Sequence, residues 1–562
     1  MKSITKYISA AFIALAMSSC LDLDPKAQLA DGNVWERTAD FENFANNFYG
    51  WTKDFGSVVI RDGLHSDIRS DIAALKGSKN VYSNGTNTIP NSDGTYTSGY
   101  SHIRRCNLLL ENAPGYTNQR DIAQYVGEAY FFRAYTYFEM MQAYGDLIIV
   151  NHTVDVDDAL MQASRNDRSE VTDAIIADLN EAVNYLGTFN EVTTGRISKE
   201  GAYAFLSRVA LYEGTWQKFR NNEARAKTLL DIAAKAAKEV IDANTFELFK
   251  NESLGIHAYR YMFTLEDVKS NPLGLTKSAN KEYIFVRCHD EVLKSIGYNI
   301  SYGTSPSGGD GLASKKFADM FLCDNGLPID KSNGRFQGYT NIRSEWQNRD
   351  ARMSVILCPP GANIYVTGYK AHTTWTDEDE PQISNFQPNY NTGYNSWKFV
   401  GERSATTGKE SFDFPIIRYA EVLLNYAEAV YERDGAISDD DLAISINLTR
   451  KRINPTMPDL TNAFVSTNGL DMREEIRRER TIELFNEGFR IDDLKRWKTA
   501  ETEMPMAFRG SKFCGGTTDE EGFMIFETAG DRQWNERNYL LPLPVDQRQL
   551  NPNLGQNTGW AN

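Results

Sequence analysis

The sequence predicts a mainly α protein, in which a scaffold of tetratricopeptide-like helical pairs is interrupted by long loop-rich insertions. Apolar residues recur at three- and four-residue spacing through the first and last thirds of the chain, as on one face of a helix. The helices predicted there are similar in length and follow one another closely, as in helical-repeat proteins. The middle of the chain, residues 251–413, is instead dominated by glycine, proline, asparagine and aromatic residues.

The composition is that of a globular protein. Of the 562 residues, 41% are hydrophobic and 24% are charged, which is the ordinary range for folded domains. The formal net charge is −16. Because binding to nucleic acid depends on a basic excess that neutralises phosphates, this balance predicts no nucleic-acid partner.

The N-terminus has the layout of a secretory signal. Lys2 and Lys6 precede a mostly apolar stretch at residues 7–17, which is too short to span a bilayer as a helix. Small residues then precede Cys20, and the run Met-Ser-Ser-Cys resembles a bacterial lipobox. We therefore expect residues 1–19 to be a lipoprotein signal peptide. The mature chain would begin at a lipidated Cys20 and be anchored to a membrane without spanning it.

The first part of the mature chain, residues 20–250, is predicted to be a helical scaffold. Its apolar periodicity predicts four helices, at residues 121–144, 170–186, 198–212 and 224–241. Gly145 follows the first of these helices, and Gly187 and Gly214 punctuate the next two. A polar loop at about residues 60–100 lies in front of these helices and is a candidate binding loop.

Residues 251–413 form the predicted loop-rich insertion region. Only short pieces of regular structure fit its composition, such as a segment at residues 313–322. Long structured loops beside a rigid scaffold are common places for ligand binding.

Helices return in the last part of the chain, residues 414–562. The pattern predicts them at residues 418–433, 439–452, 471–486 and 489–501. Asp471 and Glu474 have the spacing of a capping box. Residues 473–480 carry a dense run of charge, in which Glu474 precedes Arg478 by four positions. We interpret this run as a solvated or ion-paired helix face.

The sequence carries no recognisable catalytic motif. It contains no HExxH, GxSxG, Walker or GxGxxG pattern, and no two of its six histidines have the i, i+4 spacing of zinc ligands. Asp155, Asp157 and Asp158 could hold a structural calcium ion or could be a solvated turn. The five cysteines after Cys20 are widely spaced, so they are interpreted as buried small side chains, with one disulfide pair left open. We therefore expect no enzyme activity, no cofactor and no metal centre.

Several longer motifs resemble the SusD/RagB-like nutrient-binding lipoproteins and occur in that family's order along the chain. The motifs are GEAYFFRAY at 127–135, YGD at 144–146, NRD at 348–350 with Arg352, RYAEVLLNYAEA at 418–429, EIRRER at 475–480, EGFR at 487–490, DLKRW at 493–497, YLLPLP at 539–544 and NPNLGQN at 551–557. The resemblance covers essentially the whole mature chain, which makes residues 20–562 one SusD-like domain.

The resemblance implies a function. Members of this family are lipoproteins on the outer-membrane surface of Bacteroidota, where they sit over a SusC-like TonB-dependent transporter and capture nutrients. The implied ligand is an oligosaccharide or polysaccharide. The implied location is the cell outer membrane, surface-exposed, with anchoring through the lipid on Cys20.

Candidate ligand-binding residues combine aromatic rings, which can stack on the C–H faces of sugars, with polar groups for sugar hydroxyls. In the family, a stacking aromatic often precedes a helix like the one that begins here near residue 100, and Tyr96 best fits that role. The other candidates are Asp67, Arg69, Tyr82, Tyr298, Tyr302 and Trp375, with Trp346 a weaker one. Each aromatic could instead pack in the core, and Asp67 and Arg69 could form an ion pair that braces the loop.

Two other functions stay open from the sequence. The first is a member of the same family that binds peptides or another nutrient. The second is a secreted glycoside hydrolase, since a pair of catalytic carboxylates cannot be found by counting among 76 acidic residues.

Overall fold

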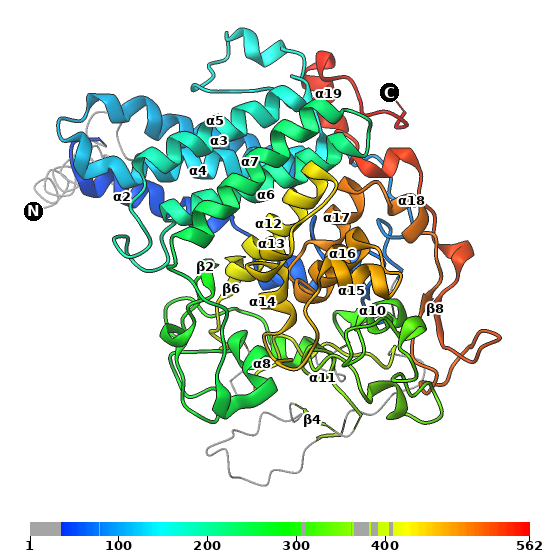
Figure 1. Ribbon diagram of the computed structural model, residues 1–562. Coiled ribbons are helices and arrows are strands. Elements are labelled where there is room, and N and C mark those ends of the chain that lie inside the picture. Colours follow the sequence, from blue (N-terminus) through cyan, green and yellow to red (C-terminus); the bar gives the residue numbers. More distant parts are fainter. Residues whose placement is uncertain are drawn as a thin grey trace, which may run out of the picture.

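The computed structural model describes residues 35–77, 79–304, 309–360, 362–364, 382–383, 392–403 and 408–561. The predicted signal peptide, Cys20 and Trp375 lie outside these residues. Within them the fold is mainly helical, as predicted (Figure 1). None of the described helices is both long enough and apolar enough to cross a membrane.

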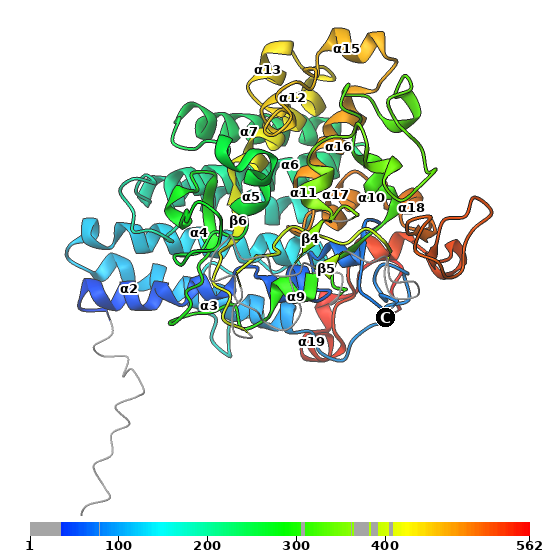
Figure 2. The same cartoon turned by 90° about the horizontal axis from the view of Figure 1, so that it is seen from below.

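Long helices build the scaffold in the first part of the chain. They are α2 (Thr38–Asn46), α3 (Gly94–Asn112), α4 (Gln119–Tyr144), α5 (Arg168–Tyr185), α6 (Lys199–Lys218) and α7 (Glu223–Asp242). From α3 onward each helix packs against the next, and α2 packs on α4. The partner of α7 on its other side is α12 (Tyr419–Asp434), which the chain reaches only after the loop-rich region. These pairings give the predicted tetratricopeptide-like arrangement (Figures 1 and 2).

Local sequence signals explain the ends of these helices. The Asp93 carboxylate accepts from the backbone N–H of Thr95 at the start of α3, and Ser198 caps α6 in the same way. Gly145 (φ 76°) ends α4, as predicted. Gly214 does not end α6 but lies inside it. A Cβ at this position would come within 2.9 Å of Leu230 Cγ on α7. This glycine allows α6 and α7 to approach closely.

After α12, the last part of the chain contains short helices. They are α13 (Asp439–Ala443), α14 (Ile446–Arg450), α15 (Asn462–Thr467), α16 (Met472–Glu483), α17 (Arg490–Arg496), α18 (Ala500–Glu503) and α19 (Val545–Leu550). The single helix predicted at 439–452 divides at Ser445, whose backbone is not helical (φ −133°, ψ −103°). The chain between α16 and α17 turns at Asn486, which has a positive φ of 60°.

The loop-rich region contains short elements only. Its helices are α8 (Ala258–Met262), α9 (Ile300–Thr304), α10 (Lys315–Met320) and α11 (Met353–Ile356).

The described strands form antiparallel pairs, β1 (Ala73–Ala74) with β3 (Leu312–Ala313), β2 (Tyr283–Arg287) with β6 (Phe414–Arg418), β4 (Asn363–Ile364) with β5 (Gln382–Ile383), and β7 (Phe508–Arg509) with β8 (Ile525–Glu527). The β2–β6 pair joins the beginning and the end of this region directly before α12.

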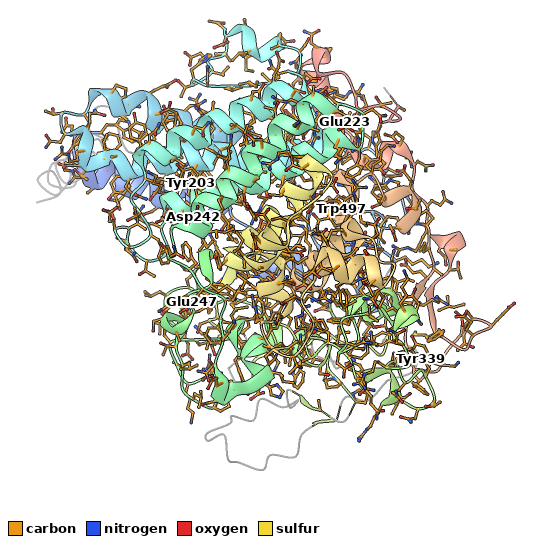
Figure 3. The ribbon with its side chains drawn as sticks, in the orientation of Figure 1. Tyr203, Glu223, Asp242, Glu247, Tyr339 and Trp497 are labelled. Atoms are coloured by element: carbon orange, nitrogen blue, oxygen red, sulfur yellow. The ribbon has the colours of Figure 1, made fainter. Side chains whose placement is uncertain are left out.

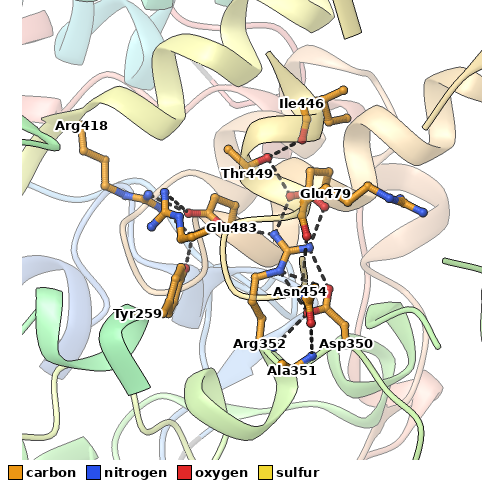
Figure 4. A network of polar contacts seen from close by, with 12 residues as sticks. Tyr259, Asp350, Ala351, Arg352, Arg418, Ile446, Thr449, Asn454, Glu479 and Glu483 are labelled. Atoms are coloured by element: carbon orange, nitrogen blue, oxygen red, sulfur yellow. Dashed lines mark hydrogen bonds and ion pairs between the residues drawn. The ribbon is translucent and has the colours of Figure 1, made fainter. Parts of the chain in front are cut away.

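The interior between the scaffold and the last helices holds a network of buried ion pairs (Figure 4). Arg352 pairs with Asp350 and Glu479, at 2.8 and 2.5 Å. Arg418 pairs with Glu483, and Glu483 also lies 3.2 Å from Arg352. All five side chains are essentially inaccessible to solvent. Several of the motif residues are therefore interior ion pairs that join the loop-rich region to α16.

The charge run of α16 forms pairs that differ from the predicted one. Arg478 pairs with Glu475 at 3.3 Å, three positions away, and not with Glu474. Asp471 caps the helix by accepting from the N–H of Glu474, but Glu474 does not return the bond. The run is ion-paired, and its face carrying Glu479 and Arg480 is buried.

Many aromatic side chains belong to the buried core, and Trp497 is labelled among the side chains in Figure 3. Trp497 follows α17 and donates its indole N–H to Glu428 Oε1 on α12, at 2.6 Å. None of the five cysteines in the described residues is in a disulfide, and four of them are buried. Of the aspartates considered for calcium, Asp158 caps a short helix by accepting from Leu160 N and lies 2.6 Å from His152 Nε2.

Candidate functional site

Two of the predicted binding loops meet in space. The segment around residues 60–82 and the glycine-rich segment around 297–313 are joined by the β1–β3 pair, in which Ala73 lies opposite Ala313. The backbone N–H of Lys76 also donates to the carbonyl of Gly309 at 3.0 Å. More than 200 residues separate these loops in the sequence, so the fold brings their aromatic side chains to one place.

Arg69 and Tyr82 form the first half of the candidate site. The Arg69 guanidinium carbon lies 3.5 Å from the centre of the Tyr82 ring, which is cation–π stacking. Arg69 Nε donates to the backbone carbonyl of Asp62 at 2.6 Å, and Asn80 donates to the Asp62 carboxylate at 2.9 Å. Tyr82 is half-buried, and its backbone N–H donates to Asn80 Oδ1 at 2.9 Å, so Asn80 links Tyr82 to the Asp62 carboxylate.

Arg61 and Tyr298 form the second half. The exposed Arg61 guanidinium lies 5.5 Å from the centre of the Tyr298 ring. The π-helix Gly56–Ile60 directly precedes Arg61, and a Cβ at Gly56 would come within 2.9 Å of the Tyr298 ring, so glycine makes room for the tyrosine. Tyr298 and Tyr302 are 37% and 41% exposed. We call Arg61, Arg69, Tyr82, Tyr298 and Tyr302 the Tyr82–Tyr298 surface.

The Glu410 side chain holds α9, the short helix that carries Tyr302, in place. Glu410 is buried, and its carboxylate accepts from the backbone N–H groups of Ile300 and Ser301 at 2.6 and 3.2 Å, at the start of α9 (Figure 2). Burial raises the pKa of Glu410 to about 7, although these hydrogen bonds oppose the rise. Glu410 thereby fixes the helix on which Tyr302 is exposed.

Asp67 has a structural position, which corrects its assignment as a ligand-binding residue. Its carboxylate is buried and accepts from the backbone N–H groups of Asn486 and Arg490, at 2.7 and 3.1 Å. Burial raises the pKa of Asp67 to about 7. Asp67 and Arg69 do not form the alternative ion pair, since Arg69 is committed to Asp62 and Tyr82. Asp67 instead ties the binding loop to the α16–α17 turn.

His65 fastens the same loop to the scaffold. Its Nδ1 lies 2.5 Å from Asp492 Oδ2 on α17, and its Nε2 lies 2.9 Å from Glu139 Oε2 on α4. Burial lowers the pKa of His65, but the two carboxylates outweigh burial and leave the pKa above its ordinary value. The loop that carries Arg69 is thus anchored to α4 in the first part of the chain and to α17 in the last part.

Tyr96 is also an interior residue, so its assignment as the main stacking platform is corrected. It is 3% exposed and packs edge-on against Tyr144 and at a tilt against Tyr100, both at 5.2 Å between ring centres. Its remaining edge lines an apolar pocket of about 260 Å³ between α3, the 148–161 segment and α19. The ring is therefore packed in the interior, with only a small exposed part at this pocket.

The sequence interpretation missed Arg61 and Asp62. Neither residue belongs to a motif, and nothing in the sequence indicates that the 61–62 step lies between two tyrosines 216 positions apart. Trp346, the weaker candidate, is half-buried on a short helix in the loop-rich region. Trp375 lies outside the described residues, so its role stays a prediction.

The Tyr82–Tyr298 surface combines groups that suit a polar, ring-shaped ligand. It offers aromatic faces and two guanidinium groups, and the Asp62 carboxylate follows Arg61 in the chain. In the part of the chain that the structure describes, no three His, Cys, Asp or Glu side chains gather closely enough to hold a metal ion. The aromatic rings and guanidinium groups of the surface allow stacking and hydrogen bonding.

The comparisons with known proteins agree over almost the whole chain. A family model described as the SusD family matches residues 281–560, and one described as "Starch-binding associating with outer membrane" matches residues 21–211. SusD-like protein P2 of Formosa agariphila is 25% identical, with 97% of each chain covered. A SusD-like protein of Bacteroides ovatus is 25% identical over 76% of this chain and 70% of the relative.

Solved structures share the fold. A SusD-like protein of Bacteroides fragilis superposes with a TM-score of 0.72 at 23% identity, covering 94% of this chain and 99% of that one. A SusD-like carbohydrate-binding protein of the same species gives 0.71 at 21% identity, covering 93% and 99%. The two family models, the full-length relatives and the shared helical architecture lead to one conclusion: the chain belongs to the SusD/RagB family.

Proposed function

We propose that this protein binds a glycan at the Tyr82–Tyr298 surface without turning it over. One observation carries the proposal, namely that two loops distant in the sequence place Tyr82 with Arg69 and Tyr298 with Arg61 on either side of the 61–62 step. Aromatic faces next to guanidinium and carboxylate groups match the alternating C–H and hydroxyl surfaces of sugars. The similarity to a solved carbohydrate-binding member of the family supports this ligand class.

We further propose that the bound glycan is delivered to a SusC-like TonB-dependent transporter in the outer membrane, with the protein tethered by lipid on Cys20. The family model associated with the outer membrane and the lipobox-like sequence support this location. Loss of labelled palmitate incorporation in Cys20→Ala, and co-purification of a transporter from membranes, are the expected results. Full incorporation in Cys20→Ala would contradict the anchor.

The binding proposal is tested by calorimetry of the purified protein against a panel of polysaccharides and oligosaccharides, with the same mixtures assayed for released reducing sugar. Saturable binding without release is expected. Release of sugar would identify a glycoside hydrolase. Binding of peptides in place of every glycan would identify the peptide-binding alternative.

A further inference from the structure

A second cleft is lined by buried polar groups that include several atoms without a hydrogen-bond partner. It has a volume of about 520 Å³, within the range of small-molecule sites. Its walls come from α8, from the end of α11 and from the 397–402 segment. We call it the Trp397 cleft. Its aromatic and ionisable lining residues are His257, Arg260, Tyr261, Trp397 and Glu402.

Arg260 is the central group of this cleft. Its guanidinium carbon lies 4.2 Å from the Trp397 ring centre and 4.8 Å from the Tyr261 ring centre, and the side chain is 3% exposed. Nη2 is bonded to Glu402 Oε1, and Tyr261 Oη donates to Glu402 Oε2 at 2.8 Å. Arg260 is therefore held rigidly, and its position is set before any ligand arrives.

Several polar atoms of the residues that line the cleft lack a hydrogen-bond partner. Arg260 Nε and Nη1, Trp397 Nε1 and His257 Nδ1 are all buried without a hydrogen-bond partner. Trp397 is 5% exposed. A buried donor left unpaired destabilises a protein, so several in one place call for an explanation. A ligand that carries oxygen acceptors would satisfy them.

The charge of the cleft indicates which kind of ligand would fit it. The positive charge of Arg260 is balanced by Glu402. Burial, followed by the nearby guanidinium, lowers the pKa of His257, so His257 is neutral at pH 7. An anionic ligand would meet the Glu402 carboxylate without an excess positive charge to receive it. A neutral molecule with several oxygens fits better, because it accepts from Arg260 and Trp397 and its hydroxyls can donate to Glu402.

The cleft is connected to the Tyr82–Tyr298 surface through the backbone. Gly401, next to Glu402, donates its N–H to Ser301 Oγ at 2.8 Å, and Ser301 lies beside Tyr302 on α9. We propose that the Trp397 cleft is a second saccharide subsite, which binds a neutral sugar unit through Arg260, Trp397 and Glu402. This inference rests on the proposed function and extends it to a second position.

The test uses fluorine NMR of the full chain labelled with 5-fluorotryptophan, which gives one signal for each of its nine tryptophans. Trp397→Phe identifies the Trp397 signal. Trp534→Phe identifies a matched control, since the indole N–H of Trp534 is also unpartnered but lies outside the cleft. The probes are maltose, cellobiose, xylobiose and lactose as neutral disaccharides, and digalacturonate as an acidic one.

At least one neutral disaccharide is expected to shift the Trp397 signal saturably and leave the Trp534 signal unchanged, also in Tyr298→Ala. Calorimetry in the Tyr298→Ala background should then show affinity lowered about fivefold by Trp397→Phe, the value of one neutral hydrogen bond, and unchanged by Trp534→Phe. Glu402→Gln should weaken binding without unfolding, because Glu402 is partly exposed.

A Trp397 signal that stays still with all four neutral disaccharides overturns the inference, as does a shift with digalacturonate alone. These outcomes are separate from failure of the proposed function. If a polysaccharide binds the wild type and the Trp397 signal stays still, only the second subsite is lost. If no glycan binds by calorimetry and none shifts any tryptophan signal, the proposed function is lost as well.

Discussion

The guanidinium of Arg69 covers one face of the Tyr82 ring, with 3.5 Å between its central carbon and the ring centre. The same guanidinium donates to the backbone at Asp62, directly after Arg61, which lies against Tyr298. A single cation thus positions one tyrosine and connects it to the segment that positions the other. This relationship makes the Tyr82–Tyr298 surface one site, and it sets the first prediction.

Tyr82→Ala and Tyr298→Ala should each lower affinity for the bound glycan about tenfold or more, because truncating a central aromatic at a binding surface removes much of the contact energy. Calorimetry with the polysaccharide that binds best measures the effect. Tyr185→Ala is the matched control, since Tyr185 on α5 is 40% exposed, close to the value for Tyr298. Equal losses in the control and in Tyr298→Ala would remove the assignment.

Tyr96→Ala should destabilise the fold by about 3 kcal/mol while leaving glycan affinity unchanged below the melting temperature, because the ring is packed between Tyr100 and Tyr144. Chemical denaturation measures the first quantity and calorimetry the second. Tyr96→Phe keeps the ring and should retain most of the stability. A loss of affinity without a loss of stability would return Tyr96 to the binding site.

Glu483→Ala should lower the free energy of unfolding by about 3–5 kcal/mol, because it leaves the buried cations Arg352, Arg418 and Arg452 short of a shared counter-charge. Glu474→Ala, whose side chain is 63% exposed, should change it by less than about 1 kcal/mol. Urea unfolding compares the two variants. Similar small effects would show that the interior network contributes little.

His65 should make stability depend on pH. Its pKa is raised in the folded state by Glu139 and Asp492, which outweigh burial and the opposing charge of Lys53. The stabilisation from its protonated form is therefore complete below its unfolded pKa of about 6.5 and is lost as pH rises through the folded value. Glu139 and Asp492 have lowered pKa values, so their contributions are lost only as pH falls well below neutral.

His65→Gln should accordingly reduce the melting temperature most at about pH 6 and flatten its fall between pH 6 and 9. Differential scanning calorimetry at several pH values measures this profile. The solvent-facing pair of His152 with Asp158 offers a control, His152→Gln, because that histidine is 45% exposed in its side chain. An unchanged pH profile in His65→Gln would show that a group other than His65 causes the pH dependence of stability.

Periodicity and motifs determined the fold class and the family of this protein. A 3.6-residue apolar repeat is a local property, so the helices α4 to α7 and α12 were predictable within a few residues. The extra length of α6 was not, because Gly214 serves the approach of α7 and its role depends on a neighbour that local sequence does not show. The division at Ser445 depends in the same way on packing.

Tertiary structure alone decided the candidate site. The charged motif residues Arg352, Arg418 and Glu479 look like surface groups by composition, and only the fold buries them against one another (Figure 4). Tyr96 and Tyr298 are chemically equal in the sequence, and burial separates them. Whether an aromatic ring stabilises the core or faces a ligand depends on which distant segments cover it, and the loops that supply those segments lack the periodicity that predicts helices.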